Sequence, residues 1–112
     1  MKRNKIVSKK LYCIASFKPK EGKTEELVST LQALEPKTTR EEGCIQYIVT
    51  QHISHPNAQG SSFPIVFNEI WKDKEAFELH CAKPYIVDFF QTHCIDPNGL
   101  VEEYNVCVYS DE

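Results

Sequence analysis

The spacing of apolar residues changes several times along this chain, and the order of the changes constrains the fold more than any other feature. Residues 11–17, 44–51, 65–71 and about 101–109 are short, apolar, β-prone stretches. Two other stretches repeat apolar residues at helical spacing, one after the first strand and one after the third. This pattern of apolar spacing therefore predicts the order strand, helix, strand, strand, helix, strand.

The first predicted helix begins at Thr24, a suitable N-cap residue that is followed by two glutamates. Leu27, Leu31 and Leu34 lie at positions i, i+4 and i+7 and form one apolar stripe. Because proline cannot continue the helical hydrogen bonds, we expect Pro36 to end or kink this helix.

The second helical region is predicted in two segments. Asp73 is a good N-cap for a helix over about 74–82, and Pro84 suits the first position of a segment that runs to about His93. The turn residues 96–99, DPNG, then end it.

The second and third strands are predicted to alternate their faces. Ile45, Tyr47 and Val49 share one face of the second strand. In the third strand, two sets of side chains point to opposite faces: Ile65, Phe67, Glu69 and Trp71 on one, and Val66, Asn68 and Ile70 on the other. The intervening residues 52–64 form a polar loop that is long for a hairpin connection.

This order predicts an α+β fold, a ferredoxin-like split βαββαβ sandwich, in which the middle strands form a hairpin and the crossovers are right-handed. Both helices then cover one face of the sheet and leave the other face bare. Because that face carries apolar residues, we expect a second copy to cover it, giving a homodimer of the dimeric α+β barrel type.

The length and charge of the chain limit its possible domain organisation and binding partners. The 112 residues suit one domain over residues 11–112, preceded by a basic flexible tip at residues 1–10. That tip holds five of the 13 Lys and Arg residues, so 8 basic residues face 16 acidic ones in the remainder. We expect neither a nucleic-acid nor a membrane partner. The N-terminus has no apolar run behind its charges, so we expect a cytoplasmic protein, with its five cysteines as reduced thiols.

Two stretches carry a family resemblance. Residues 39–47, TREEGCIQY, resemble the passage between the first helix and the second strand of the antibiotic-biosynthesis-monooxygenase (quinol monooxygenase-like) family. Residues 69–86, EIWKDKEAFELHCAKPYI, resemble the E-x-W-x-D-x-x-A-x-x-x-H motif of that family. With the strand order, the resemblance covers nearly the whole chain from Leu11 to Tyr109.

The resemblance implies a homodimer whose sheets stack face to face, with a small pocket between sheet and helices in each subunit. It implies oxidation of small phenolic or quinol-like aromatics by O₂ without flavin or metal, so no cofactor is expected. Other members isomerise a small phosphorylated signalling metabolite or degrade haem. The haem-degrading members carry an Asn on the first strand, which this chain lacks.

Trp71 and His80 are the predicted catalytic residues, Trp71 as a flat wall for the aromatic substrate and His80 as the acid/base. We expect both to line one cavity. Further side chains are predicted to bind the substrate through apolar walls or hydrogen bonds: Tyr47, Phe67, Asn68, Glu69, Phe77, Tyr85 and Phe89.

Several of these residues have structural alternatives. Glu69, if buried, needs a partner such as His80 or Arg40. The family places its Asn four residues before the Trp, where this chain has Phe67, whereas Asn68 points to the opposite face. Core packing is the alternative for Trp71 and the tyrosines.

No metal site is expected, because the adjacent His80–Cys81 and His93–Cys94 pairs diverge by about 100° on a helix. Two alternatives to the monooxygenase stay open. One is an isomerase of a small phosphorylated metabolite, and the other is a non-catalytic ligand-binding or stress-response dimer.

Overall fold

The structure, a computed structural model, describes residues 9–111. Residues 1–8 of the predicted basic tip lie outside the described residues. The strands are β1 (Leu11–Pro19), β2 (Cys44–Gln51), β3 (Ile65–Trp71) and β4 (Val101–Ser110). They form an antiparallel sheet in the order β2-β3-β1-β4. The helices are α1 (Thr24–Gln32), α2 (Glu35–Thr38), α3 (Lys74–Cys81) and α4 (Pro84–Phe89), and a π-helix, Phe90–Ile95, follows. This βαββαβ arrangement confirms the predicted ferredoxin-like fold.

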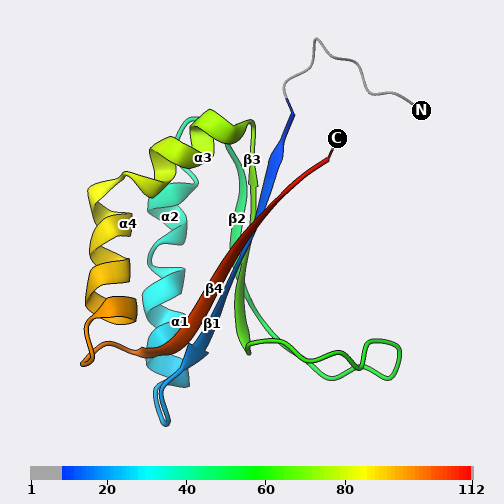
Figure 1. The fold of residues 1–112 in the computed structure, drawn as a ribbon, viewed down its shortest axis with the longest axis vertical. Coiled ribbons are helices and arrows are strands. Elements are labelled where there is room, and N and C mark those ends of the chain that lie inside the picture. The colour runs from blue at the N-terminus through cyan, green and yellow to red at the C-terminus, as the bar shows by residue number, and fades with distance from the viewer. Residues whose placement is uncertain (1–8, 112) are drawn as a thin grey trace.

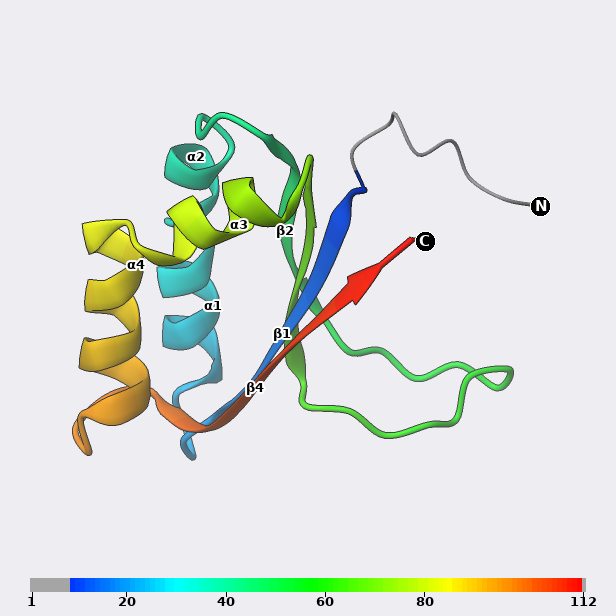
Figure 2. The same ribbon diagram turned by 45° about the horizontal axis from the view of Figure 1, so that its top comes forward.

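All the helices pack on one face of the sheet (Figure 1). No element of residues 9–111 covers the opposite face, and the β2–β3 connection, residues 52–64, projects away from the sheet in both views (Figure 2). None of the described helices is both long and apolar enough to span a membrane.

The core lies between the sheet and the helices. Every second residue of β3 is buried, from Ile65 to Trp71, and so is every second residue of β1 from Cys13 to Phe17. Leu27 and Leu31 of α1 are fully buried against this face. The predicted alternation of β3 and the leucine stripe of α1 are therefore confirmed.

Two details of the first helical region differ from the prediction. Lys23, not Thr24, occupies the N-cap position, because its carbonyl oxygen already accepts the first helical hydrogen bond, from Leu27 N at 2.9 Å. The chain does not leave the helical layer at Pro36. It breaks after Gln32 and resumes as α2, with Pro36 in the first turn, where proline needs no donor.

β2 has the predicted bounds, but one of its predicted inward residues points outward. A β-bulge between Cys44 and Gln46 inserts Ile45 as an extra residue in the pairing with β3. Ile45 is consequently 51% exposed, while Tyr47 is 6% exposed and faces the helices. The prediction that Ile45 and Tyr47 share a face is therefore wrong.

The second helical region begins as predicted. The Asp73 carboxylate accepts a hydrogen bond from Ala76 N at 2.8 Å, so Asp73 caps α3. Pro84 begins α4, but the segment predicted to continue to His93 changes to a π-helix at Phe90. π-Helical turns widen a helix by one residue per turn and are frequent beside functional sites.

Candidate functional site

A cavity of about 50 Å³ lies between the inner face of the sheet and helices α3 and α4. Six of the nine predicted site residues line it: Tyr47, Phe67, Glu69, Phe77, His80 and Phe89. Several other lining residues were not predicted as site residues, among them Cys13, Phe17, Cys81 and Phe90. The lining is mainly aromatic and aliphatic, as in most sites for small organic ligands.

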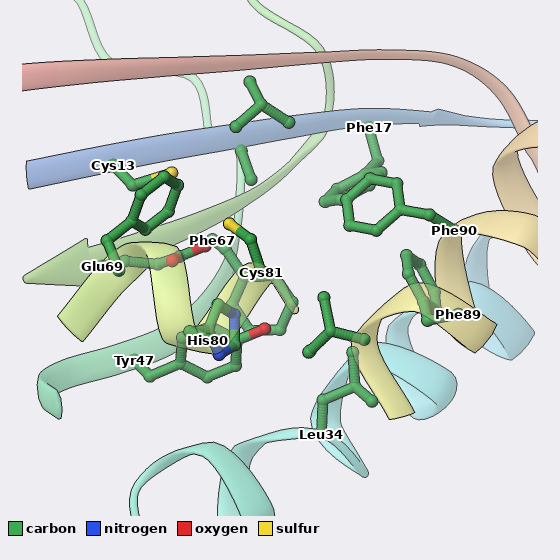
Figure 3. A pocket seen from close by; sticks show the side chains of 14 residues that line it. Cys13, Phe17, Leu34, Tyr47, Phe67, Glu69, His80, Cys81, Phe89 and Phe90 are labelled. Carbon is green, nitrogen blue, oxygen red and sulfur yellow. The ribbon is translucent and has the colours of Figure 1, made fainter. Parts of the chain in front are cut away.

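The polar and aromatic groups occupy different parts of the pocket. Phe17, Phe89 and Phe90 gather at one end, and Cys13 and Glu69 lie at the other (Figure 3). The three rings are in mutual contact, with centroids 5.3 to 6.3 Å apart. The cavity therefore has an apolar end made of rings and a second end that holds a carboxyl group.

His80 is brought to the cavity by α3. Its side chain lies on the same face of the helix as buried Ala76, four residues earlier, and is 4% exposed. The imidazole ring packs on Trp71 at 4.5 Å between centroids and meets the Tyr47 ring at 5.3 Å. Burial lowers the pKa of His80, and the neighbouring Glu41 only partly offsets this. His80 is therefore held neutral at physiological pH, ready to accept a proton.

Glu69 is the second proton-exchanging group of the cavity. It is 5% exposed on β3, and its Oε1 accepts a hydrogen bond from Trp71 Nε1 at 3.0 Å. Burial raises the pKa of Glu69 to about 7, and the hydrogen bonds from Trp71 and Cys13 oppose this rise. The suggested partners, His80 and Arg40, are not its hydrogen-bond partners, and Arg40 is exposed. Glu69 therefore exchanges a proton near neutral pH.

Trp71 does not line the cavity, which contradicts the expectation that it forms one wall with His80. It ends β3 and is fully buried beneath α3, where its ring contacts His80 and its indole nitrogen binds Glu69. Trp71 thus lies behind the two proton-exchanging groups and supports both.

Two other predicted residues also lie outside the cavity lining. Asn68 points to the open face, as its place in the strand requires, and donates to Thr50 Oγ1 at 2.9 Å. The Tyr85 hydroxyl is 2.8 Å from Thr38 Oγ1 and donates to Glu41. Tyr85 therefore reaches the site only through Glu41.

Glu41 is a residue of the site that was not predicted from the sequence. Its Oε2 lies 2.9 Å from His80 Nδ1, and its side chain is 8% exposed. It belongs to the TREEGCIQY stretch, so the family resemblance pointed to its neighbourhood, but nothing local indicated that its side chain is buried. The three residues from Glu41 to Gly43 lead into β2, and Gly43 has a φ of +87°, with Ala76 so close that a Cβ there would clash. Glycine thus lets this segment approach α3.

Among residues 9–111, no three His, Cys, Asp or Glu side chains cluster as metal ligands would. Burial raises the pKa of Cys81 to about 11 and that of Cys94 to about 12, so these thiols stay protonated at neutral pH.

Comparisons with known proteins agree with this architecture. A family model described as antibiotic biosynthesis monooxygenase matches residues 11–92. A protein from Shewanella oneidensis of solved structure is 38% identical, with 92% of this chain and 91% of that chain covered and a TM-score of 0.74. A Pseudomonas aeruginosa protein is 24% identical, with 92% and 94% covered and a TM-score of 0.71.

A Dabb-family protein with a ferredoxin-like fold, from Mesorhizobium loti, is 18% identical, with 91% and 96% covered and a TM-score of 0.66. At that identity the likeness concerns the fold alone. Among curated proteins, none matches the chain at a significant level.

Proposed function

The chain belongs to the antibiotic biosynthesis monooxygenase family, and from that premise we propose that it is a cofactor-independent monooxygenase of a small phenolic or quinol-like aromatic. One observation carries the proposal. Two buried proton-exchanging groups, His80 and Glu69, line one cavity whose remaining lining is mostly aromatic and aliphatic.

The proposed chemistry needs little from the protein. His80 removes a proton from the substrate hydroxyl, and the resulting electron-rich anion reacts with O₂. For a para-quinol, one oxygen atom enters the ring, the other leaves as water, and the substrate supplies all the electrons and becomes a hydroxyquinone. The apolar cavity excludes water from the anion, and Glu69 or the Tyr47 hydroxyl group donates a hydrogen bond to it.

The size of the cavity limits the substrate. A cavity of about 50 Å³ holds only a few water molecules, whereas benzene occupies an engineered cavity of roughly 150 Å³. A single ring therefore enters only if side chains of the lining move, and a substrate of several fused rings requires a larger rearrangement. We infer a single-ring substrate.

The isomerase alternative receives no support from the cavity. A phosphorylated ligand needs cationic groups, and no Lys or Arg is among the lining residues within residues 9–111. The lysines of the motif, Lys72, Lys74 and Lys83, are exposed. Lys72 is also paired with Glu42 at 3.1 Å.

A non-catalytic dimer is the second candidate function, and the small cavity volume favours it. It shares with the monooxygenase the proposed pairing of two copies through the open face. That face presents apolar side chains from neighbouring strands, including Ile14, Ile48 and Ile70, and Ile48 is 48% exposed. Turnover distinguishes the two functions.

The test uses single-ring para-quinols under ¹⁸O₂, with oxygen uptake and product mass measured against the autoxidation background. A monooxygenase incorporates one ¹⁸O atom into the hydroxyquinone. We expect His80→Ala to lower turnover by about 10²- to 10⁴-fold, the usual contribution of a general base. His52→Ala, which replaces an exposed histidine of the long loop, is the matched control. Failure of the wild-type protein to accelerate oxygen incorporation into any such quinol would favour the non-catalytic dimer.

A further inference from the structure

The hydrogen bond between Glu41 and His80 joins two side chains that are both almost completely buried. Glu41 Oε2 lies 2.9 Å from His80 Nδ1, and the two side chains are 8% and 5% exposed. The same oxygen also accepts a hydrogen bond from the Tyr85 hydroxyl group. One oxygen that accepts from a hydroxyl group and also lies within hydrogen-bond distance of an imidazole nitrogen is an arrangement that an ionised carboxylate accommodates best.

The backbone around Glu41 holds this carboxylate in place. Glu41 N donates to Thr38 O at 3.0 Å, and Cys44 N donates to Glu41 O at 3.1 Å. On the side-chain end, Tyr85 is itself hydrogen-bonded to Thr38, which is fully buried at the end of α2. Glu41 is thus fixed from α2, from the start of β2 and from α4, and its carboxylate cannot readily turn away from α3.

Fixing the carboxylate also fixes the proton on the imidazole. A neutral histidine carries one ring proton, and a carboxylate can only accept a hydrogen bond, so the proton must sit on Nδ1. The lone pair is then on Nε2. Because His80 lines the cavity while its Nδ1 is engaged by Glu41, Nε2 is the nitrogen available to a ligand.

We propose that Glu41 is a positioning residue that holds His80 in the Nδ1–H tautomer, so that Nε2 is the proton acceptor of the cavity. Glu41 does not touch the substrate. When Nε2 takes up a proton, the imidazolium formed is paired with the Glu41 carboxylate, which stabilises that charge in a site where both side chains are buried. The catalytic consequence rests on the proposed function, but the tautomer does not.

The test has a spectroscopic arm that requires no substrate. Long-range ¹⁵N–¹H correlation spectra of the uniformly labelled protein at pH 8 distinguish the two histidine tautomers. We expect the Nδ1–H pattern for His80, assigned as the signal lost in His80→Ala. Glu41→Leu removes the side-chain acceptor for Nδ1–H, so we expect loss of that pattern. Glu42→Gln, which removes the adjacent and 91% exposed carboxylate, should leave it unchanged.

The kinetic arm applies if a quinol is turned over. Glu41→Leu should lower kcat by about 10²-fold or more and leave KM within about threefold, because it alters the base and not the apolar walls. An Nε2–H pattern in the wild-type protein overturns the proposal, and this result does not depend on whether the variant folds. An unchanged His80 pattern in folded Glu41→Leu, which has no acceptor for Nδ1–H, also overturns it. An Nδ1–H pattern without turnover of any quinol supports the positioning role and counts against the proposed function alone.

Discussion

Glu69 should make the stability of this protein fall as pH rises through neutrality. Burial raises its pKa from an ordinary value of 4.5 to about 7. Such a group binds more protons in the folded state, so its favourable contribution is fully present below pH 4.5 and is lost as pH passes about 7. At 1.36 kcal/mol per pH unit, the shift corresponds to about 3 kcal/mol of unfolding free energy.

The variant that isolates this effect is Glu69→Gln. The Gln side-chain carbonyl can still accept the hydrogen bond from Trp71 Nε1, so the packing is preserved while the titration is removed. We expect the unfolding free energy of the variant, minus that of the wild type, to increase by about 2.5 kcal/mol between pH 5 and pH 8, because part of the effect lies below pH 5. His80 acts in the opposite direction, since its pKa is lowered, but it contributes equally to both proteins and is removed by the subtraction.

The measurement is urea unfolding followed by Trp71 fluorescence at several pH values and one protein concentration, because association shifts apparent stability. Glu103→Gln on β4, where the side chain is 59% exposed, controls for a carboxylate-to-amide change without burial. A stability difference between wild type and Glu69→Gln that stays constant within about 0.5 kcal/mol from pH 5 to pH 8 would refute the reasoning, because uncertainty in each extrapolated value is of that order.

Three further predictions concern the fold and its assembly. Gly22→Ala and Gly43→Ala both place a Cβ at positive φ, but of the two only the Cβ at position 43 would meet a neighbour, Ala76 Cβ at 2.6 Å. In urea unfolding we expect Gly43→Ala to lose about 1–3 kcal/mol more unfolding free energy than Gly22→Ala. Equal losses in the two variants would contradict the clash. Asp73→Ala should cost about 1 kcal/mol through loss of the cap on α3, and Asp73→Asn, which caps nearly as well, should cost less. Light scattering at micromolar concentration should give twice 12.9 kDa for the wild type and a monomer for Ile48→Asp. A monomeric wild type would contradict the proposed dimer.

Much of the fold follows from short-range features of the sequence. The bounds of β2 and β3, the burial of alternate β3 residues and the capping of α3 by Asp73 were all predicted correctly. Each depends on a residue and its neighbours within a few positions, through side-chain alternation or a local hydrogen bond. The element order then allowed few topologies, and the ferredoxin-like one was among them.

The tertiary structure alone decided how the site is assembled. Glu41 and His80 are 39 positions apart, and their contact depends on how closely the segment before β2 approaches α3. The same packing places Trp71 behind His80 instead of in the cavity. Periodicity in the sequence identifies the face on which a side chain lies. It does not specify which of two neighbouring inward side chains lines the cavity, because that depends on the exact distance between the sheet and the helix.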